Sequence, residues 1–246
     1  MRKVITDDCY QKQSLSNRIK QLNRLKQLGF KLVYTENIDF YKDEYICVHT
    51  LPENLFDLVD LFDTSKISEN NKLLSYFDIE LLEKIKNVRD QYLKAAVIVR
   101  KVFNDIIDKS GSSYLNHLYT VSQSDDYISS VAGLLHDIIE DTDITALDLL
   151  EIGIDKSIVE TIFIVTKPKH ERINMTEEER LEAYNKEIDD IIKSGNIHAL
   201  RLKVRDMKDN SNPERLKLLS SEKQEWFNKK YGNNLKKLEK ALESRN

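Results

Sequence analysis

Four ionisable side chains, His136, Asp137, Glu140 and Asp141, lie within six consecutive residues of the stretch GLLHDIIEDTDIT. Leucine and isoleucine residues surround them, so we expect this stretch to form a largely buried helix. Burying ionisable groups is unfavourable unless they pair or bind a metal. An imidazole combined with carboxylates suits Mn, Fe, Zn or Co ions, whereas an all-oxygen shell suits Mg or Ca. The stretch therefore predicts a site for Mn²⁺ or another divalent transition metal.

Two adjacent residues cannot complete a coordination shell, so further ligands are expected on other helices. His117 lies upstream in SSYLNHLYTV, and Asp206 lies downstream in LKVRDMKDN. A single histidine such as His117 would more often be an ordinary core or surface residue. The order His, then His-Asp, then Asp is more specific than either half alone, and it favours a shared metal site.

These motifs resemble those of the HD superfamily of metal-dependent phosphohydrolases, and within it the hydrolase domain of the RelA/SpoT homologues that degrade (p)ppGpp. The likeness covers roughly residues 94–219 and includes DKSGSSYLNHLYTV, GLLHDIIEDTDIT, IVTK and KVRDMKDN in the family's order. The resemblance implies hydrolytic removal of the 3′-pyrophosphate from an alarmone nucleotide. It further implies that one Mn²⁺ ion is bound by His117, His136, Asp137 and Asp206.

The resemblance also implies roles for three neighbouring residues. Glu140 and Asp141 would orient or deprotonate the attacking water, and Asn210 would support the nucleotide or the metal shell. Two alternatives stay open for the carboxylates, which could instead orient His136 or be solvated at the end of a helix. Asn210 could simply cap a helix end.

Substrate recognition departs from the family at two places. Asp108 and Lys109 stand where the alarmone hydrolases carry a basic pair, and DMKDNS stands where they carry DRLHNM. We expect Lys109 and Arg215 to contact phosphate. The alternatives are another nucleotidase or phosphodiesterase of the same superfamily, and a nucleotide-sensing module without catalysis.

The elements that must position these residues are mostly helices. Apolar residues recur every three or four positions from Ile79 to Ile106, which predicts one long helix closed by Gly111. We predict a mainly α bundle of the HD type. Its further helices are expected at residues 113–122, 126–141, 145–151, 156–165, 176–193 and 197–210, followed by a helical tail at 214–244.

The first residues differ in character from this helical part. A helix is predicted at residues 14–28, and residues 30–34 and 45–49 are β-branched and aromatic runs that could pair as strands. We expect a small N-terminal segment of mixed or helical structure over residues 1–70, followed by the HD-type domain over residues 71–246.

Composition limits the other possibilities. The 246 residues include 38 Lys and Arg against 42 Asp and Glu, so no broad basic surface for nucleic acid is expected. The two cysteines, Cys9 and Cys47, lack metal-ligand spacing. The N-terminus lacks a secretory signal, and no stretch is long and apolar enough for a membrane span. We therefore expect a cytoplasmic protein whose partner is a small nucleotide substrate; the oligomeric state stays open.

Overall fold

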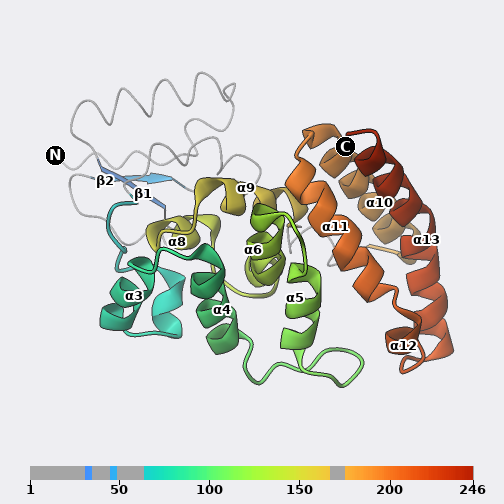
Figure 1. Cartoon of the computed structure of the whole chain (residues 1–246), viewed down its shortest axis with the longest axis horizontal. Helices are drawn as coiled ribbons and strands as arrows, with labels where there is room; N and C mark the ends of the chain where they lie inside the picture. Colours follow the sequence, from blue (N-terminus) through green and yellow to red (C-terminus); the bar gives the residue numbers. More distant parts are fainter. Residues whose placement is uncertain (1–30, 35–44, 49–63, 167–174, 246) are drawn as a thin grey trace.

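Helices dominate the structure, a computed structural model that describes residues 31–34, 45–48, 64–166 and 175–245 (Figure 1). The predicted mainly α fold is therefore confirmed. The helix expected at residues 14–28 lies outside the described part of the chain.

The two predicted strands are present and pair with each other. Strand β1 (Lys31–Tyr34) runs parallel to β2 (Tyr45–Val48), with Leu32 opposite Ile46. Pairing of these two runs was expected from their β-branched and aromatic residues.

The helical part begins with the 3₁₀ helix η4 (Lys72–Ser75), followed by α3 (Ile79–Lys86) and α4 (Gln91–Val102). The prediction of one helix closed by Gly111 is wrong, because the chain stops and restarts between α3 and α4. The side chain of Asp90 accepts a hydrogen bond from the backbone amide of Leu93 and so caps a new helix. Apolar periodicity continues across this break, which explains why it was missed.

The middle of the chain forms five short helices, and two of them divide a stretch that was predicted to be one helix. The helices are α5 (Tyr114–Ser122), α6 (Tyr127–Leu135), α7 (Ile138–Asp141), α8 (Ala146–Glu151) and α9 (Lys156–Val165).

The last part contains α10 (Glu177–Ser194), α11 (Ile197–Asn210), α12 (Pro213–Leu216) and α13 (Ser221–Glu243). The start of α10 forms the capping box expected at Thr176, and the bounds of α11 agree with the prediction. Figure 1 shows α11 between the middle helices and the pair formed by α10 and α13.

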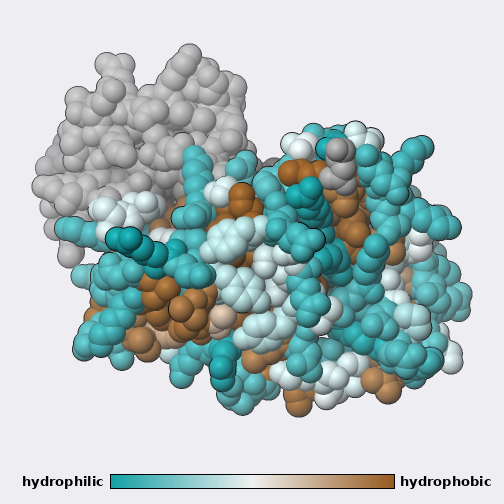
Figure 2. All heavy atoms as spheres, in the orientation of Figure 1, coloured by the Kyte–Doolittle hydropathy of each residue, from teal (hydrophilic) through white to brown (hydrophobic). Residues whose placement is uncertain are grey.

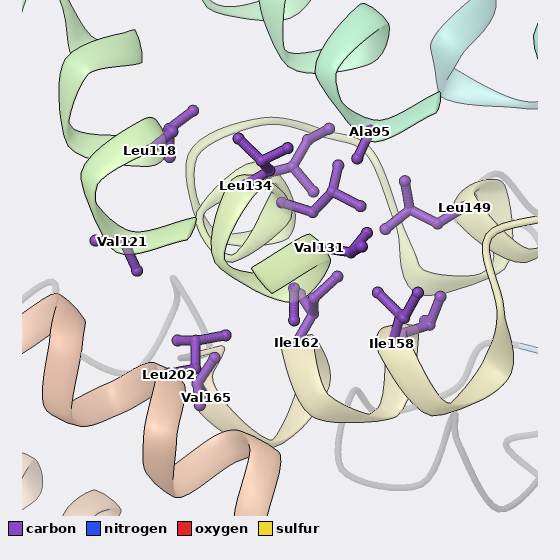
Figure 3. Close-up of a cluster of buried hydrophobic side chains, with 14 of the residues drawn as sticks. Ala95, Leu118, Val121, Val131, Leu134, Leu149, Ile158, Ile162, Val165 and Leu202 are labelled. Carbon is purple, nitrogen blue, oxygen red and sulfur yellow. The ribbon is translucent and has the colours of Figure 1, made fainter. Parts of the chain in front are cut away.

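Helix α6 lies at the centre of the core. It packs against α4, α5, α9 and α11, and every residue from Ser129 to Leu135 is buried. Figure 3 shows apolar side chains from these helices meeting around α6. The side chains labelled there come from α6, from these neighbours and, for Leu149, from α8: Ala95, Leu118, Val121, Val131, Leu134, Leu149, Ile158, Ile162, Val165 and Leu202.

On the face shown in Figure 2 the described surface is largely hydrophilic, and apolar residues gather over α3 and α4. These helices carry Ile79, Leu81, Leu93 and Val97, which are 38% to 55% exposed. Among the described helices, none has the length and apolar character needed to cross a membrane.

Candidate metal centre

Three helices that pack together bring the predicted ligands to one place. His117 lies on α5, His136 directly follows α6, and Asp206 lies on α11. Helices α5, α6 and α11 contact one another pairwise. The packing of α6 between its neighbours therefore positions side chains that are far apart in the sequence.

The His-Asp pair occupies the junction between α6 and α7, where the sequence predicted a continuous helix. His136 ends α6, and Asp137 precedes α7 with φ −91° and ψ −5°. The helical hydrogen bond from the Asp141 amide to the Asp137 carbonyl persists at 2.8 Å. The His136 ring is fixed by its Nδ1, which lies 2.8 Å from the Gly133 carbonyl oxygen. Its Nε2 is thereby directed towards the other candidate ligands.

Four side-chain atoms of the candidate ligands lie close to one another. His117 Nε2 lies 3.5 Å from Asp137 Oδ2 and 3.7 Å from Asp206 Oδ1. His136 Nε2 lies 3.0 Å from Asp137 Oδ2 and 3.8 Å from Asp206 Oδ1. With ligands ~2.1 Å from a metal, neighbours at a right angle are about 3.0 Å apart and opposite ligands about 4.2 Å apart. The observed separations fall within this range.

His117, His136 and Asp137 form a group that could hold a divalent metal ion. The side-chain nitrogen His136 Nε2 is buried and has no hydrogen-bond partner among the described residues, although it lies close to Asp137. A buried polar atom without a hydrogen bond is unfavourable, and metal coordination would satisfy it. Asp206 lies close enough to both imidazoles to be a fourth ligand.

The four groups strongly affect one another's protonation. Burial alone would lower the pKa of His117, but its hydrogen bond to Asp137 and the surrounding carboxylates raise that pKa to about 10. Burial also opposes a charged His136, yet the Asp137 carboxylate raises its pKa. Burial would raise the pKa of Asp137 and of Asp206, but the neighbouring cations hold both well below the usual range. In the metal-free protein, protons on the imidazoles therefore balance the negative charge of the carboxylates. A bound divalent cation would replace these protons.

Asp206 is held by two residues of its own helix. Lys203 Nζ lies 2.7 Å from Asp206 Oδ2, and Asn210 Nδ2 donates to Asp206 Oδ1. Asn210 thus contacts the candidate ligand Asp206, and its support of a metal shell stays a prediction. Burial would lower the pKa of Lys203, but the Asp206 carboxylate raises it, so the ammonium group stays charged.

The two predicted catalytic carboxylates have different surroundings. Asp141 is exposed, and its Oδ2 lies 2.9 Å from the Tyr114 hydroxyl, which also donates to Asp137 Oδ2 at 2.5 Å. Glu140 is partly buried and helps to raise the pKa of Lys203. Asp141 is therefore connected through one hydroxyl group to a candidate metal ligand.

The two residues expected to contact phosphate are also placed differently. Arg215 Nη2 lies 2.8 Å from Asp108 Oδ2, and Arg215 Nη1 donates to Asp209 Oδ2. Asp209 Oδ2 in turn lies 2.7 Å from His117 Nδ1. Lys109 is exposed in the turn before α5. Arg215 is thus already paired with two carboxylates beside a candidate ligand.

The sequence analysis did not identify Tyr114 or Asp209 as site residues. Both stand three positions from a candidate ligand, Tyr114 before His117 and Asp209 after Asp206. Residues three apart on a helix are neighbours, so this spacing could have indicated them. No protein-family model matches the chain, and no curated protein matches it either.

Proposed function

We propose that this protein is a metal-dependent phosphohydrolase that acts on a nucleotide. The observation that carries the proposal is the convergence of His117, His136, Asp137 and Asp206 around a buried imidazole nitrogen that has no hydrogen-bond partner among the described residues. The donor set of two imidazoles and two carboxylates fits Mn²⁺, our first choice, or another divalent transition metal.

A bound Mn²⁺ ion would supply a water ligand of lowered pKa and would shield phosphate charge. The residues around it would orient the reactants. Asp141, which is exposed and contacts the Tyr114 hydroxyl, would accept a proton from an attacking water. Burial and the nearby carboxylates raise the pKa of Tyr114, so its hydroxyl keeps its single proton and can donate it to Asp137 or to Asp141.

The substrate we propose first is (p)ppGpp, cleaved at its 3′-pyrophosphate, because the motifs resemble those of the alarmone hydrolases. One observation favours a second candidate within the same chemistry. The carboxylate of Asp108, which stands where that family has a basic residue, holds Arg215 at 2.8 Å. The second candidate substrate is a nucleotide with a base other than guanine, or another phosphorylated nucleotide.

The test is hydrolysis of a nucleotide panel that includes (p)ppGpp, by protein whose Mn²⁺ content has been measured. Product chromatography separates the candidates, because alarmone hydrolysis releases pyrophosphate whereas a nucleotidase or a phosphodiesterase leaves a nucleoside or a linear monophosphate. Metal-loaded protein that hydrolyses none of the panel would contradict the proposal. Nucleotide binding without any turnover would instead favour a sensing module.

Two variants test the role of the carboxylates. Asp141→Asn should retain bound Mn²⁺ and lose at least about 100-fold in turnover, because general-base catalysis typically contributes 10²- to 10⁴-fold. Asp143→Asn removes an exposed carboxylate two residues away and should leave turnover unchanged. Equal turnover of the two variants would exclude Asp141 as the base.

A further inference from the structure

We propose that Asp209, Arg215 and Asp108 form a charged chain that positions His117 as a metal ligand. This inference deepens the proposed function and rests on its metal centre. The three residues come from α11, α12 and the turn before α5, so the chain joins three separate segments at one imidazole ring.

Asp209 determines which nitrogen of His117 faces the other candidate ligands. His117 Nδ1 lies 2.7 Å from Asp209 Oδ2, whereas Nε2 lies 3.5 Å from Asp137 and 3.7 Å from Asp206. A carboxylate accepts but cannot donate when ionised, so Nδ1 must carry the proton in this contact. The lone pair of a neutral His117 is then on Nε2, where a metal ion can accept it. A carboxylate in this position also makes the imidazole a more basic ligand.

Arg215 offsets the charge that Asp209 adds to the site. The Nη1 atom of Arg215 donates to the same Asp209 Oδ2 atom that faces His117. This Nη1 atom also lies 3.3 Å from His117 Nδ1. The Asp209 side chain is only 9% exposed, so its charge needs a partner nearby. With Arg215 present, Asp209 can orient the imidazole without leaving an uncompensated negative charge.

Asp108 anchors the guanidinium group. Asp108 Oδ2 lies 2.8 Å from Arg215 Nη2, while Asp108 Oδ1 accepts hydrogen bonds from the Ser110 amide and hydroxyl and from the Ser112 amide. The turn contains Gly111 with φ 84°, a conformation that favours glycine. The turn leads directly into α5, so Asp108 fixes Arg215 relative to the helix that carries His117.

This arrangement gives Arg215 a different role from the phosphate contact expected from the sequence. Its Nη1 and Nη2 atoms each contact a carboxylate, and its side chain is 25% exposed. We assign Arg215 and Asp108 as positioning residues that act on the metal through Asp209 and His117.

The test measures Mn²⁺ binding by electron paramagnetic resonance, with the metal alone and no nucleotide. Asp209→Asn should weaken Mn²⁺ binding by about 10- to 100-fold, the usual effect of losing a partner of a metal-bound histidine. Asp108→Asn keeps an oxygen acceptor for the turn and should weaken binding by a smaller factor. Glu214→Gln is the matched control, because it removes a carboxylate next to Arg215 from an exposed ion pair with Lys217 and should leave binding unchanged.

A second readout separates positioning from general destabilisation. In Zn²⁺-loaded protein labelled with ¹⁵N-histidine, Asp209→Asn should shift the Nδ1 signal of His117 and leave that of His136, which lies on the Gly133 carbonyl, unchanged. If Asp209→Asn does not fold, Asp108→Asn is judged by the same two measurements. A folded variant with unchanged Mn²⁺ affinity and an unchanged His117 signal would overturn the inference.

The outcomes also separate this inference from the proposed function. Wild-type protein that binds Mn²⁺ through His117 but hydrolyses no nucleotide would contradict the phosphohydrolase and leave the positioning chain supported. Wild-type protein that binds neither Mn²⁺ nor Zn²⁺ would overturn both.

Discussion

Gly133 allows α5 and α6 to approach closely enough for their ligands to meet, and replacing it should damage both stability and metal binding. A Cβ atom at this position would lie 2.8 Å from the Val121 carbonyl oxygen, 2.9 Å from Ser122 Cα and 3.0 Å from Ser122 N. All three atoms belong to the backbone of α5, so no side chain can rotate away. The Gly133 carbonyl also orients His136.

The size of the effect follows from these distances. Ordinary carbon contacts are about 3.5 Å or longer, so the helices must separate by roughly half an ångström in Gly133→Ala. Overpacking of this kind costs about 1–3 kcal/mol, offset by up to about 1 kcal/mol of improved helix propensity. Because all three contacts are with backbone atoms, the overpacking cost should be about 2–3 kcal/mol, which leaves a net loss of about 1–2 kcal/mol in the free energy of unfolding.

Urea denaturation measures this loss, and Mn²⁺ titration measures its effect on the ligands. Because His117 lies on α5 and His136 follows α6, separation of the helices should weaken Mn²⁺ binding by about tenfold, or ~1.4 kcal/mol. Gly232→Ala is the control, since nothing lies within 4 Å of the added Cβ on α13. It should stabilise the protein by about 0.5–1 kcal/mol. A Gly133→Ala protein at least as stable as wild type would refute the reasoning.

Two further substitutions test the surroundings of the site, and a third tests Asp126, the N-cap of α6. Lys203→Met leaves Asp206 without its buried cation and should lower the free energy of unfolding of the metal-free protein by about 3–5 kcal/mol. Mn²⁺ should restore part of this loss. Equal urea midpoints for the variant and the wild type would exclude the predicted loss. Burial would raise the pKa of Asp126, but its hydrogen bonds hold that pKa at about 2, below the ordinary 3.8. The ionised carboxylate therefore stabilises the fold above pH ~4. This contribution is lost as the pH falls towards 2. Asp126→Asn should therefore cost about 1–2 kcal/mol at pH 6, and the difference from wild type should narrow on acidification; a difference independent of pH would contradict the assignment. Tyr114→Phe should lower turnover by about tenfold without changing the shape of its pH profile, because the hydroxyl orients Asp137 and does not titrate; a displaced alkaline limb would show otherwise.

The sequence predicted the helical fold well where local chemistry marks helix ends. The capping box at Thr176 and the bounds of α11 were both anticipated. The breaks between α3 and α4 and between α6 and α7 were not, because apolar residues continue at helical spacing through them. At the second break, Asp137 makes no side-chain capping hydrogen bond and no glycine marks the junction, so tertiary packing decides where α6 ends.

The candidate ligands could be predicted because their residue types and order are distinctive. Their supporting partners were not predicted: the three-residue spacing places Asp209 and Tyr114 beside candidate ligands, but only the packing of the helices shows which side chains they contact. Arg215 illustrates the same limit. A cation near a phosphate-binding motif predicts a phosphate contact. Only the fold reveals that Asp108, in the turn before α5, contacts Arg215.

The separation of His117 from Asp206 along the chain has a consequence for how the protein would withstand unfolding. An ion held by both would act as a cross-link between α5 and α11, closing a long loop that the unfolded chain leaves open. At a thousandfold excess over its dissociation constant, such an ion contributes about 4 kcal/mol. Resistance to proteases in the cell would then depend on the supply of the metal. Starvation for that metal would shorten the lifetime of the protein and leave its site without the ion.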